Sequence, residues 1–413
     1  MLGEVIVRGQ LGIGSDDYER DVPTKINDIS NIEDIYVSND SIYAITQDGS
    51  LYAWGDNDYG QLGIGKKESN VPKKVEIQEK IEKVINSISN TFVITKDKKI
   101  YAWGNNSDGV LGIGNRETQY LPVKINLDAD IEEIFLEYSS VYGKVAFAKT
   151  TLGEIYAWGS NEDGICDIET KYQTLPTKIK NLNNVDKIYC SYGSCYAKTK
   201  TGEVYAWGKN NEGQLGIGNK ENQNIPVKVS NLSNVDNIYV CFGGYGFAQL
   251  NSGEVYAWGK NDKGQLGIGN TENQSIPVKI NELANVEEIY RNSSSIYAKT
   301  KTGEVYAWGE NDEGQLGLGN TENQNVPTKI EGLPNVANFL GGAIITSDGK
   351  LYSIRGKDYL PELITLDGKL YNNGEYVEGI GGDRLPCEDY KKDLTIIYST
   401  NNVYINSHIV QDN

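Results

Sequence analysis

One tetrapeptide, Tyr-Ala-Trp-Gly, occurs six times along this chain of 413 residues. The copies contain all six tryptophans and follow one another at spacings of 49, 55, 49, 51 and 50 residues. The tryptophans are Trp54, Trp103, Trp158, Trp207, Trp258 and Trp308. A fixed period of this length is the signature of a repeat architecture, in which each unit buries its apolar face against its neighbour. We therefore expect one repeat protein rather than the two or three domains that the length alone suggests.

The clearest unit, residues 203–253, predicts about four short strands and few helices. It opens with the β-branched and aromatic segment 204–207, followed by polar turn residues and the glycine-rich segment 214–218. Two further strand candidates, 235–240 and 246–250, end in an Asn-Ser-Gly turn. Both faces of segment 204–207 are apolar, so this strand needs cover on both sides, which sheets stacked face to face provide. The sequence thus predicts an all-β fold, a β-propeller.

The two ends of the chain decide how many blades this propeller has. Residues 3–14 are a shortened copy of the unit that begins inside a strand, which suits a propeller closed by pairing of the termini. We expect residues 1–355 to form the propeller, with seven blades favoured. Residues 356–413 are either a degenerate C-terminal β segment or an eighth, degenerate blade, and spacing alone leaves both alternatives open.

Charge and hydropathy exclude several classes of partner. The net charge is −18, from 39 basic and 57 acidic residues. This balance opposes binding to nucleic acid or to an anionic membrane, where basic groups supply most of the affinity. The apolar runs are far shorter than a membrane span, and the start of the chain does not resemble a signal peptide. We expect a cytoplasmic monomer, with delivery as an effector as the alternative.

The cysteines are odd in number and do not recur with the repeat. They are Cys166, Cys190, Cys195, Cys241 and Cys387. A disulfide framework or a structural zinc site would need paired, recurring spacings. We therefore expect free thiols in a reducing compartment.

Three features suggest chemistry, and each has a simpler structural explanation. Residues 60–67 approach a phosphate-binding loop, but Lys67 replaces the hydroxyl residue and no helix is predicted to follow. Asp56 begins a turn that hints at a calcium loop without the final glutamate, and Asx-turn chemistry explains its recurrence. The one histidine, His408, has no catalytic or metal-binding companions in the surrounding sequence. The sequence therefore predicts no catalytic residue, no cofactor and no metal.

A cluster of aromatic residues is the best candidate for a partner-binding face. These residues fall in loops that enter the hairpin of successive units and are Tyr138, Tyr142, Tyr192, Phe242 and Tyr245. Exposed aromatic side chains on a rigid scaffold often anchor protein partners. The alternative is that they pack between blades.

The repeated segments resemble the regulator of chromosome condensation repeat family. The shared features are Glu-Val-Tyr-Ala-Trp-Gly, an Asn-x-x-x-Gly turn, Gln-Leu-Gly-Ile-Gly, a proline and a hairpin ending in x-Gly, over residues 3–355. The resemblance implies a propeller, usually of seven blades, that binds a protein on one face. Members of the family include an exchange factor for a Ran-type GTPase, ubiquitin ligase and photoreceptor domains, secreted β-lactamase inhibitors and bacterial effectors.

The departures from the family pattern narrow the functional hypotheses. The histidine that usually precedes the alanine strand is missing from every unit, and so is the Gly-Trp-Arg-His-Thr motif of the photoreceptor. The main hypothesis is a non-catalytic protein–protein interaction scaffold with an unknown protein partner. One alternative is a guanine-nucleotide exchange factor for a Ran/Rab-type small GTPase. Another is an enzyme inhibitor resembling the propeller-type β-lactamase inhibitors. The Lys-, Asn- and Ile-rich composition is typical of a bacterial member.

Overall fold

The computed structural model describes most of the repeat region and short pieces of the C-terminal part. The described residues are 9–15, 24–38, 40–138, 144–162, 164–166, 170–241, 243–333, 336–340 and 343–346, with six short strands between 351 and 404. They form strands and turns, and these described residues contain no helix. The chain divides into two compact units. The first holds residues 1–200, 205–209 and 222–227, and the second holds residues 201–204, 210–221 and 228–413.

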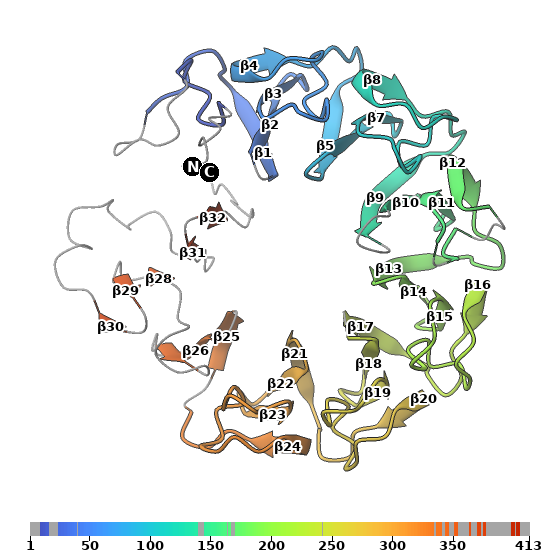
Figure 1. The fold of residues 1–413 in the computed structure, drawn as a ribbon, viewed down its shortest axis with the longest axis vertical. Helices are drawn as coiled ribbons and strands as arrows, with labels where there is room; N and C mark the ends of the chain where they lie inside the picture. The colour runs from blue at the N-terminus through green and yellow to red at the C-terminus, as the bar shows by residue number, and fades with distance from the viewer. Residues whose placement is uncertain are drawn as a thin grey trace, which may run out of the picture. The chain divides into compact units, whose positions relative to one another are not determined.

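Four antiparallel sheets, each of four strands in chain order, lie largely in the first unit (Figure 1). The first two sheets contain β1 (Ile32–Ser38), β2 (Ser41–Thr46), β3 (Leu51–Gly55), β4 (Ser69–Lys74), β5 (Ile81–Asn86), β6 (Asn90–Thr95), β7 (Ile100–Gly104) and β8 (Gln119–Lys124). The next two contain β9 (Ile131–Tyr138), β10 (Lys144–Thr150), β11 (Ile155–Ser160), β12 (Tyr172–Lys178), β13 (Val185–Ser191), β14 (Ser194–Thr199), β15 (Val204–Gly208) and β16 (Gln223–Lys228). Each sheet contains one copy of Tyr-Ala-Trp-Gly, whereas the sequence unit 203–253 contributes two strands to one sheet and two strands to the next.

The second unit contains two more four-stranded sheets of the same order and several smaller sheets. The four-stranded sheets consist of β17 (Val235–Cys241), β18 (Tyr245–Leu250), β19 (Val255–Gly259), β20 (Gln274–Lys279), β21 (Val286–Asn292), β22 (Ser295–Thr300), β23 (Val305–Gly309) and β24 (Gln324–Lys329). The smaller ones consist of β25 (Val336–Leu340), β26 (Ala343–Thr346), β27 (Leu351–Ser353), β28 (Leu363–Ile364), β29 (Leu370–Asn372), β30 (Glu375–Tyr376), β31 (Tyr398–Thr400) and β32 (Asn402–Tyr404).

The prediction of an all-β propeller is confirmed by these sheets. Six sheets of four antiparallel strands, one per repeat, are the blades of a β-propeller. The predicted closure by pairing of the termini involves residues 1–8, which lie outside the described residues. The choice between seven and eight blades and the domain boundary at residue 355 stay predictions.

The tryptophans join consecutive sheets. Each lies in the third strand of its sheet, and its indole Nε1–H donates to a backbone carbonyl in the glycine-rich turn of the preceding repeat. The pairs are Trp54 to Gln10 at 3.1 Å, Trp103 to Gln61 at 2.7 Å, Trp158 to Val110 at 2.6 Å, Trp207 to Ile165 at 3.1 Å, Trp258 to Gln214 at 2.7 Å and Trp308 to Gln265 at 2.9 Å. All six are at most 3% exposed. A buried indole needs such an acceptor, so each bond aligns one sheet on the next.

The apolar core lies between neighbouring sheets. In the second unit, Trp308 packs among Phe247, Val255, Ala257 and Leu266 of the preceding repeat. The rings of Phe247 and Trp308 meet edge to face at 6.1 Å. The Tyr and Trp face of a third strand therefore covers the sheet before it.

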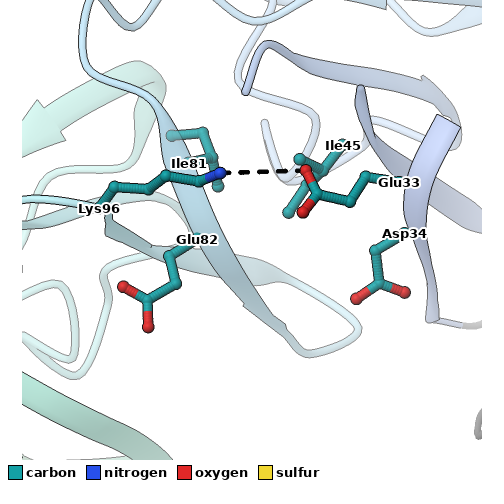
Figure 2. A pocket seen from close by; sticks show the side chains of 6 residues that line it. All are labelled: Glu33, Asp34, Ile45, Ile81, Glu82 and Lys96. Atoms are coloured by element: carbon teal, nitrogen blue, oxygen red, sulfur yellow. Dashed lines mark ion pairs between the residues drawn. The ribbon is translucent and has the colours of Figure 1, made fainter. Parts of the chain in front are cut away.

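An ion pair bridges the first two sheets at the surface. Nζ of Lys96, which follows β6, lies 4.0 Å from Oε2 of Glu33 on β1 (Figure 2). About half of each side chain is exposed, so this pair contributes little to stability. Both residues of the pair line a cavity between these two sheets.

Candidate partner-binding surface

The hairpin between β13 and β14 places an aromatic ring at the surface in an unusual backbone conformation. The register pairs Cys190 with Cys195 and Ser191 with Ser194, which leaves a turn of only two residues, Tyr192 and Gly193. Their φ angles are +51° and +80°, as a type I′ turn requires. Asparagine is favoured at the first of these positions, and a tyrosine there costs on the order of 1 kcal/mol. Backbone strain of this kind is concentrated at functional sites in proteins, so the Tyr192 turn is a candidate for one.

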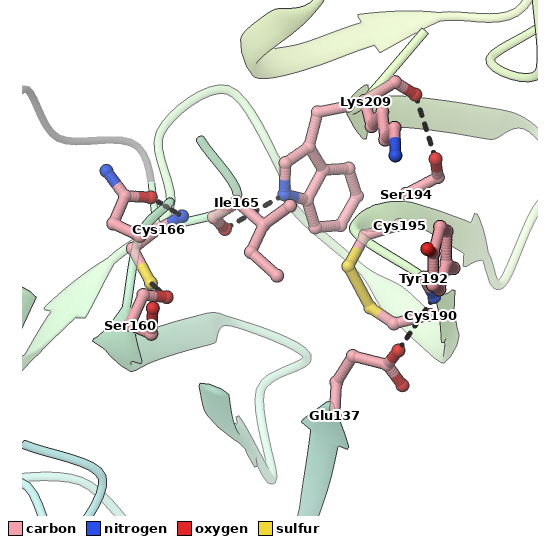
Figure 3. The surroundings of a disulfide bond; sticks show 11 residues. Glu137, Ser160, Ile165, Cys166, Cys190, Tyr192, Ser194, Cys195 and Lys209 are labelled. Carbon is pink, nitrogen blue, oxygen red and sulfur yellow. Dashed lines mark hydrogen bonds between the residues drawn. A yellow bond between two sulfur atoms is a disulfide. The ribbon is translucent and has the colours of Figure 1, made fainter. Parts of the chain in front are cut away.

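The Tyr192 ring is accessible and has a cationic neighbour. Its exposed fraction is 45%, and Nζ of Lys209 lies 4.6 Å from the ring centroid (Figure 3). Lys209 is itself held against the hairpin. Its backbone N–H donates to Gly193 O at 2.8 Å, and its carbonyl accepts from Ser194 Oγ at 2.8 Å. The hairpin therefore presents a flat ring with a positive charge over it, on a backbone tied at several points.

A disulfide between Cys190 and Cys195 closes this hairpin (Figure 3). The two residues face each other across the ladder with their Cα atoms 4.1 Å apart. The prediction that all the cysteines are free thiols is therefore wrong for this pair. Cys166 and Cys241 are free and buried, and burial raises the pKa of each thiol to about 12. Cys387 lies outside the described residues.

A carboxyl group of the neighbouring sheet also holds the hairpin. The backbone N–H of Tyr192 donates to Oε1 of Glu137 on β9 at 3.0 Å (Figure 3). Burial raises the pKa of Glu137 to about 7, and the bond from Tyr192 opposes this shift only in part. The position of Tyr192 thus depends on a group that titrates near neutral pH.

The structure separates the aromatic residues that the sequence groups together. Tyr192 is exposed, whereas Tyr245 is 1% exposed. Tyr245 begins β18, its ring packs edge to face against Phe247 at 5.9 Å, and its hydroxyl donates to Ser293 O. The expectation that Tyr245 contributes to an exposed face is therefore wrong. Tyr138 ends β9, and its side chain lies outside the described residues, as do Tyr142 and Phe242.

Sequence reasoning missed the disulfide, Glu137 and Lys209. The signal for the disulfide was present, because Cys190 and Cys195 flank a Tyr-Gly pair at the spacing of opposed residues in a two-residue hairpin. Glu137 carried no such signal. Its role depends on a contact with Tyr192, which lies 55 residues further along the chain in the next repeat.

The turn that hinted at a calcium or phosphate site uses its polar atoms for its own structure. Asn57 Oδ1 accepts from the Leu62 N–H at 2.9 Å, and its Nδ2 donates to the carbonyls of Gly65 and Lys67, both at 2.8 Å. The same bond from the leucine or cysteine N–H recurs in the other repeats, at Asn106, Asn161, Asn210, Asn261 and Asn311. The Asx-turn interpretation therefore accounts for this loop.

The described part of the chain offers neither a metal-binding cluster nor a helix that could span a membrane. There, no group of three or more His, Cys, Asp or Glu side chains is placed to hold a metal ion. The described residues also include no helix long and apolar enough to cross a bilayer. His408 lies outside the described residues.

The fold, a propeller of about fifty-residue blades joined by tryptophans, defines the class of protein, and comparison with known families identifies it further. The RCC1-like domain model matches residues 139–357, and the regulator of chromosome condensation (RCC1) repeat matches residues 48–93 and 97–135. A second model of this repeat matches residues 32–61. The chain belongs to the RCC1 repeat family.

Curated relatives and solved structures agree with this assignment. The human and mouse E3 ubiquitin-protein ligase HERC2 are each 31% identical over 286 residues, which is 67% of this chain but only 5% of HERC2. The chain thus corresponds to a small part of those relatives. The structure of Prp20p from Saccharomyces cerevisiae, described with its binding to Gsp1p and histones, has a TM-score of 0.50 at 20% identity and covers 73% of this chain and 78% of its own. The structure of human WBSCR16 has a TM-score of 0.50 at 21% identity, and the match covers 74% of this chain and 83% of WBSCR16.

Proposed function

We propose that this propeller is a protein–protein interaction scaffold and that the hairpin around Tyr192 is part of its partner-binding surface. The observation that carries the proposal is the exposed ring of Tyr192, held in a left-handed turn by the disulfide, Glu137 and Lys209. A rigid aromatic side chain loses little conformational entropy on binding and buries a large area. Strain that the surrounding structure maintains at an accessible position is characteristic of functional sites.

We further propose that the protein is not an enzyme. The polar groups of the repeat turns bind their own loops, as Asn57 does, and are therefore occupied. The ligase activity of HERC2 belongs to a protein of which this chain matches 5%, so it gives no ground for assigning that activity here. For the location, we propose an oxidising compartment in place of the expected cytoplasm, because the hairpin carries the Cys190–Cys195 disulfide and disulfides persist mainly in oxidising compartments.

The test of the scaffold compares two matched tyrosines. Tyr192 is 45% exposed and Tyr59 is 44% exposed, so alanine at either removes a similar accessible ring. Partners are captured on the full-length chain from an extract of the source organism, identified by mass spectrometry and purified. We expect Tyr192→Ala to weaken binding of a genuine partner at least tenfold and Tyr59→Ala to leave it unchanged. Equal binding by both variants, with unchanged circular dichroism, would contradict the proposed surface.

A second candidate is an exchange factor for a small GTPase. It is favoured by the fold that this chain shares with Prp20p, whose structure is described with its binding to Gsp1p. The assay is release of a fluorescent guanine nucleotide from Ran-type and Rab-type GTPases. Acceleration by the chain would support this candidate, and an unchanged release rate would rule it out for the GTPases tested.

A further inference from the structure

A cavity of about 460 Å³ lies between the first two sheets of the first unit, at the end of β1 and β5 that is opposite to the β1–β2 and β5–β6 turns. Figure 2 shows its lining: Glu33, Asp34 and Ile45 from the first sheet, and Ile81, Glu82 and Lys96 from the second. The two isoleucines are buried, at 2% and 1% exposed, whereas Glu33 and Glu82 are about half exposed. The cavity therefore has an apolar floor and an acidic mouth.

The repeat itself shows what fills the corresponding space elsewhere. Ile45 on β2 pairs with Asp34 on β1, and Lys149 on β10 pairs with Glu133 on β9 in the same register. Nζ of Lys149 lies 3.5 Å from Glu132 and 3.4 Å from Glu133. It also donates to the backbone carbonyl of Asp186, on the first strand of the next sheet, at 2.7 Å. In the third repeat, then, a lysine side chain crosses from one sheet to the next.

Other repeats place a long polar side chain at this position as well. Lys198 lies 2.8 Å from Asp186, and Lys299 lies 3.2 Å from Glu287. Gln249 Nε2 donates to the carbonyl of Val286 at 2.7 Å and so crosses to the following sheet. In the first repeat the apolar Ile45 occupies the position instead, and in the second repeat Ile94 does so, paired with Lys83.

The acidic residues around Lys149 have counterparts around the cavity, but Lys149 itself is replaced there by Ile45. Glu33 and Asp34 occupy the same register positions as Glu132 and Glu133. Glu82 occupies the same register position as Asp186. The one cation in the lining, Lys96, extends past Ile81 toward Glu33, and its Nζ lies 4.0 Å from Oε2 of Glu33 (Figure 2). Lys98 pairs with the Glu82 carboxylate at 2.7 Å from outside the lining. The three carboxylates of the lining face two lysines, Lys96 and Lys98, so a single negative charge remains in excess.

We propose that this cavity binds a lysine side chain of a partner protein. The aliphatic stem packs on Ile45 and Ile81, and the ammonium group lies between the carboxylates of Glu33 and Asp34 and reaches the backbone carbonyl of Glu82. The incoming lysine thus takes the place that Lys149 occupies in the third repeat. A lysine fits better than an arginine because the internal counterpart is a single ammonium on a four-carbon stem. This site is separate from the Tyr192 hairpin, so either can fail without the other.

The test uses n-butylammonium, which reproduces the lysine side chain, and the neutral n-butanol as its matched control. Each is titrated into the full-length chain with 13C-labelled isoleucine methyl groups. We expect saturable shifts at Ile45 and Ile81 with butylammonium, with a Kd in the millimolar range, and no saturation with butanol. The Glu33→Gln/Asp34→Asn variant should weaken butylammonium at least tenfold. Equal responses to the two probes, or equal binding by the variant, would overturn the proposal.

Two further arms identify the source of the ammonium group. Ile45→Lys should fill the cavity from within and abolish butylammonium binding, and its circular dichroism reports whether it folds. If it does not fold, the carboxylate variant still decides the question. Nα-acetyl-lysine-N-methylamide represents a lysine within a protein, and spermidine represents a free polyamine. Binding of the lysine amide at least as tight as spermidine supports a protein partner, whereas tenfold tighter spermidine would overturn it in favour of a polyamine.

Discussion

The backbone N–H of Tyr192 donates a hydrogen bond of 3.0 Å to Oε1 of Glu137, and this bond joins the candidate binding hairpin to the preceding sheet. The carboxyl group is buried enough that its pKa rises to about 7. The accessible ring is therefore positioned by a group that changes its charge close to neutral pH.

The raised pKa predicts that Glu137 makes the fold less stable as the pH rises. With a pKa near 4.5 when unfolded and about 7 when folded, the folded chain holds one more proton between these values. The contribution of Glu137 to stability is thus fully present below pH 4.5 and is lost as the pH rises through 7. Between pH 5 and pH 8, the free energy of unfolding measured with urea should fall by about 2 kcal/mol more for the native chain than for Glu137→Gln. Equal losses in the two proteins would contradict the prediction.

The Cys190–Cys195 disulfide should stabilise the hairpin modestly. The bond closes a loop with a sequence separation of 5, for which chain entropy predicts about 2 kcal/mol. In oxidising buffer, the free energy of unfolding of Cys190→Ser/Cys195→Ser should be lower than that of the native chain by this amount. After reduction, the native chain should be no more stable than the variant. Alkylation of the denatured chain should label two more cysteines after reduction than before. An equal count would show that the disulfide does not form.

The turn residue at 192 should be suboptimal for stability. Tyr192 has a φ of +51°, a conformation that asparagine adopts at lower cost. We expect Tyr192→Asn to raise the free energy of unfolding by about 0.5–1 kcal/mol and to weaken partner capture as much as Tyr192→Ala does. Denaturant unfolding and binding are measured on the same preparations. A gain in stability with unchanged binding would remove the functional reason for the tyrosine.

Two glycines of one turn provide a matched test of the tryptophan contact. A Cβ at Gly267 would lie 2.8 Å from Nε1 of Trp308, whereas a Cβ at Gly269 would meet nothing closer than 3.9 Å. Both glycines have a positive φ, of +69° and +85°, so alanine costs about 1 kcal/mol at either position from the backbone alone. Gly267→Ala should lose about 1–3 kcal/mol more, because it displaces the indole from Gln265 O. Equal losses measured by thermal unfolding would contradict this account.

Period and composition were enough to predict the repeated sheets. The Val-Tyr-Ala-Trp segment at 204–207 was predicted as a strand and lies in β15. Its two apolar faces predicted cover on both sides, and Trp207 is fully buried against the preceding repeat. These features repeat locally, so one unit contains the information for all of them.

The candidate site depends on differences between repeats and on contacts between them. Tyr192 and Tyr245 occupy similar loops. Tyr192 lies in a two-residue turn and is exposed, whereas Tyr245 begins a strand and is buried. Sequence pattern does not distinguish these outcomes, because a single added residue in the turn changes which side chain is accessible. The buried carboxyl of Glu137 and the cavity beside Ile45 likewise arise only when neighbouring sheets are packed together.

The measurement that tests the central claim most directly is photo-crosslinking from residue 192 in the source organism. A benzoylphenylalanine replaces Tyr192 in one strain and the equally exposed Tyr59 in another, and crosslinked proteins are identified by mass spectrometry. The scaffold account predicts one protein crosslinked from position 192 and absent from position 59, with its yield reduced by Glu137→Ala, which removes the carboxyl that holds the hairpin. The same proteins at both positions, or none at 192, would contradict the assignment of this hairpin as the partner-binding surface.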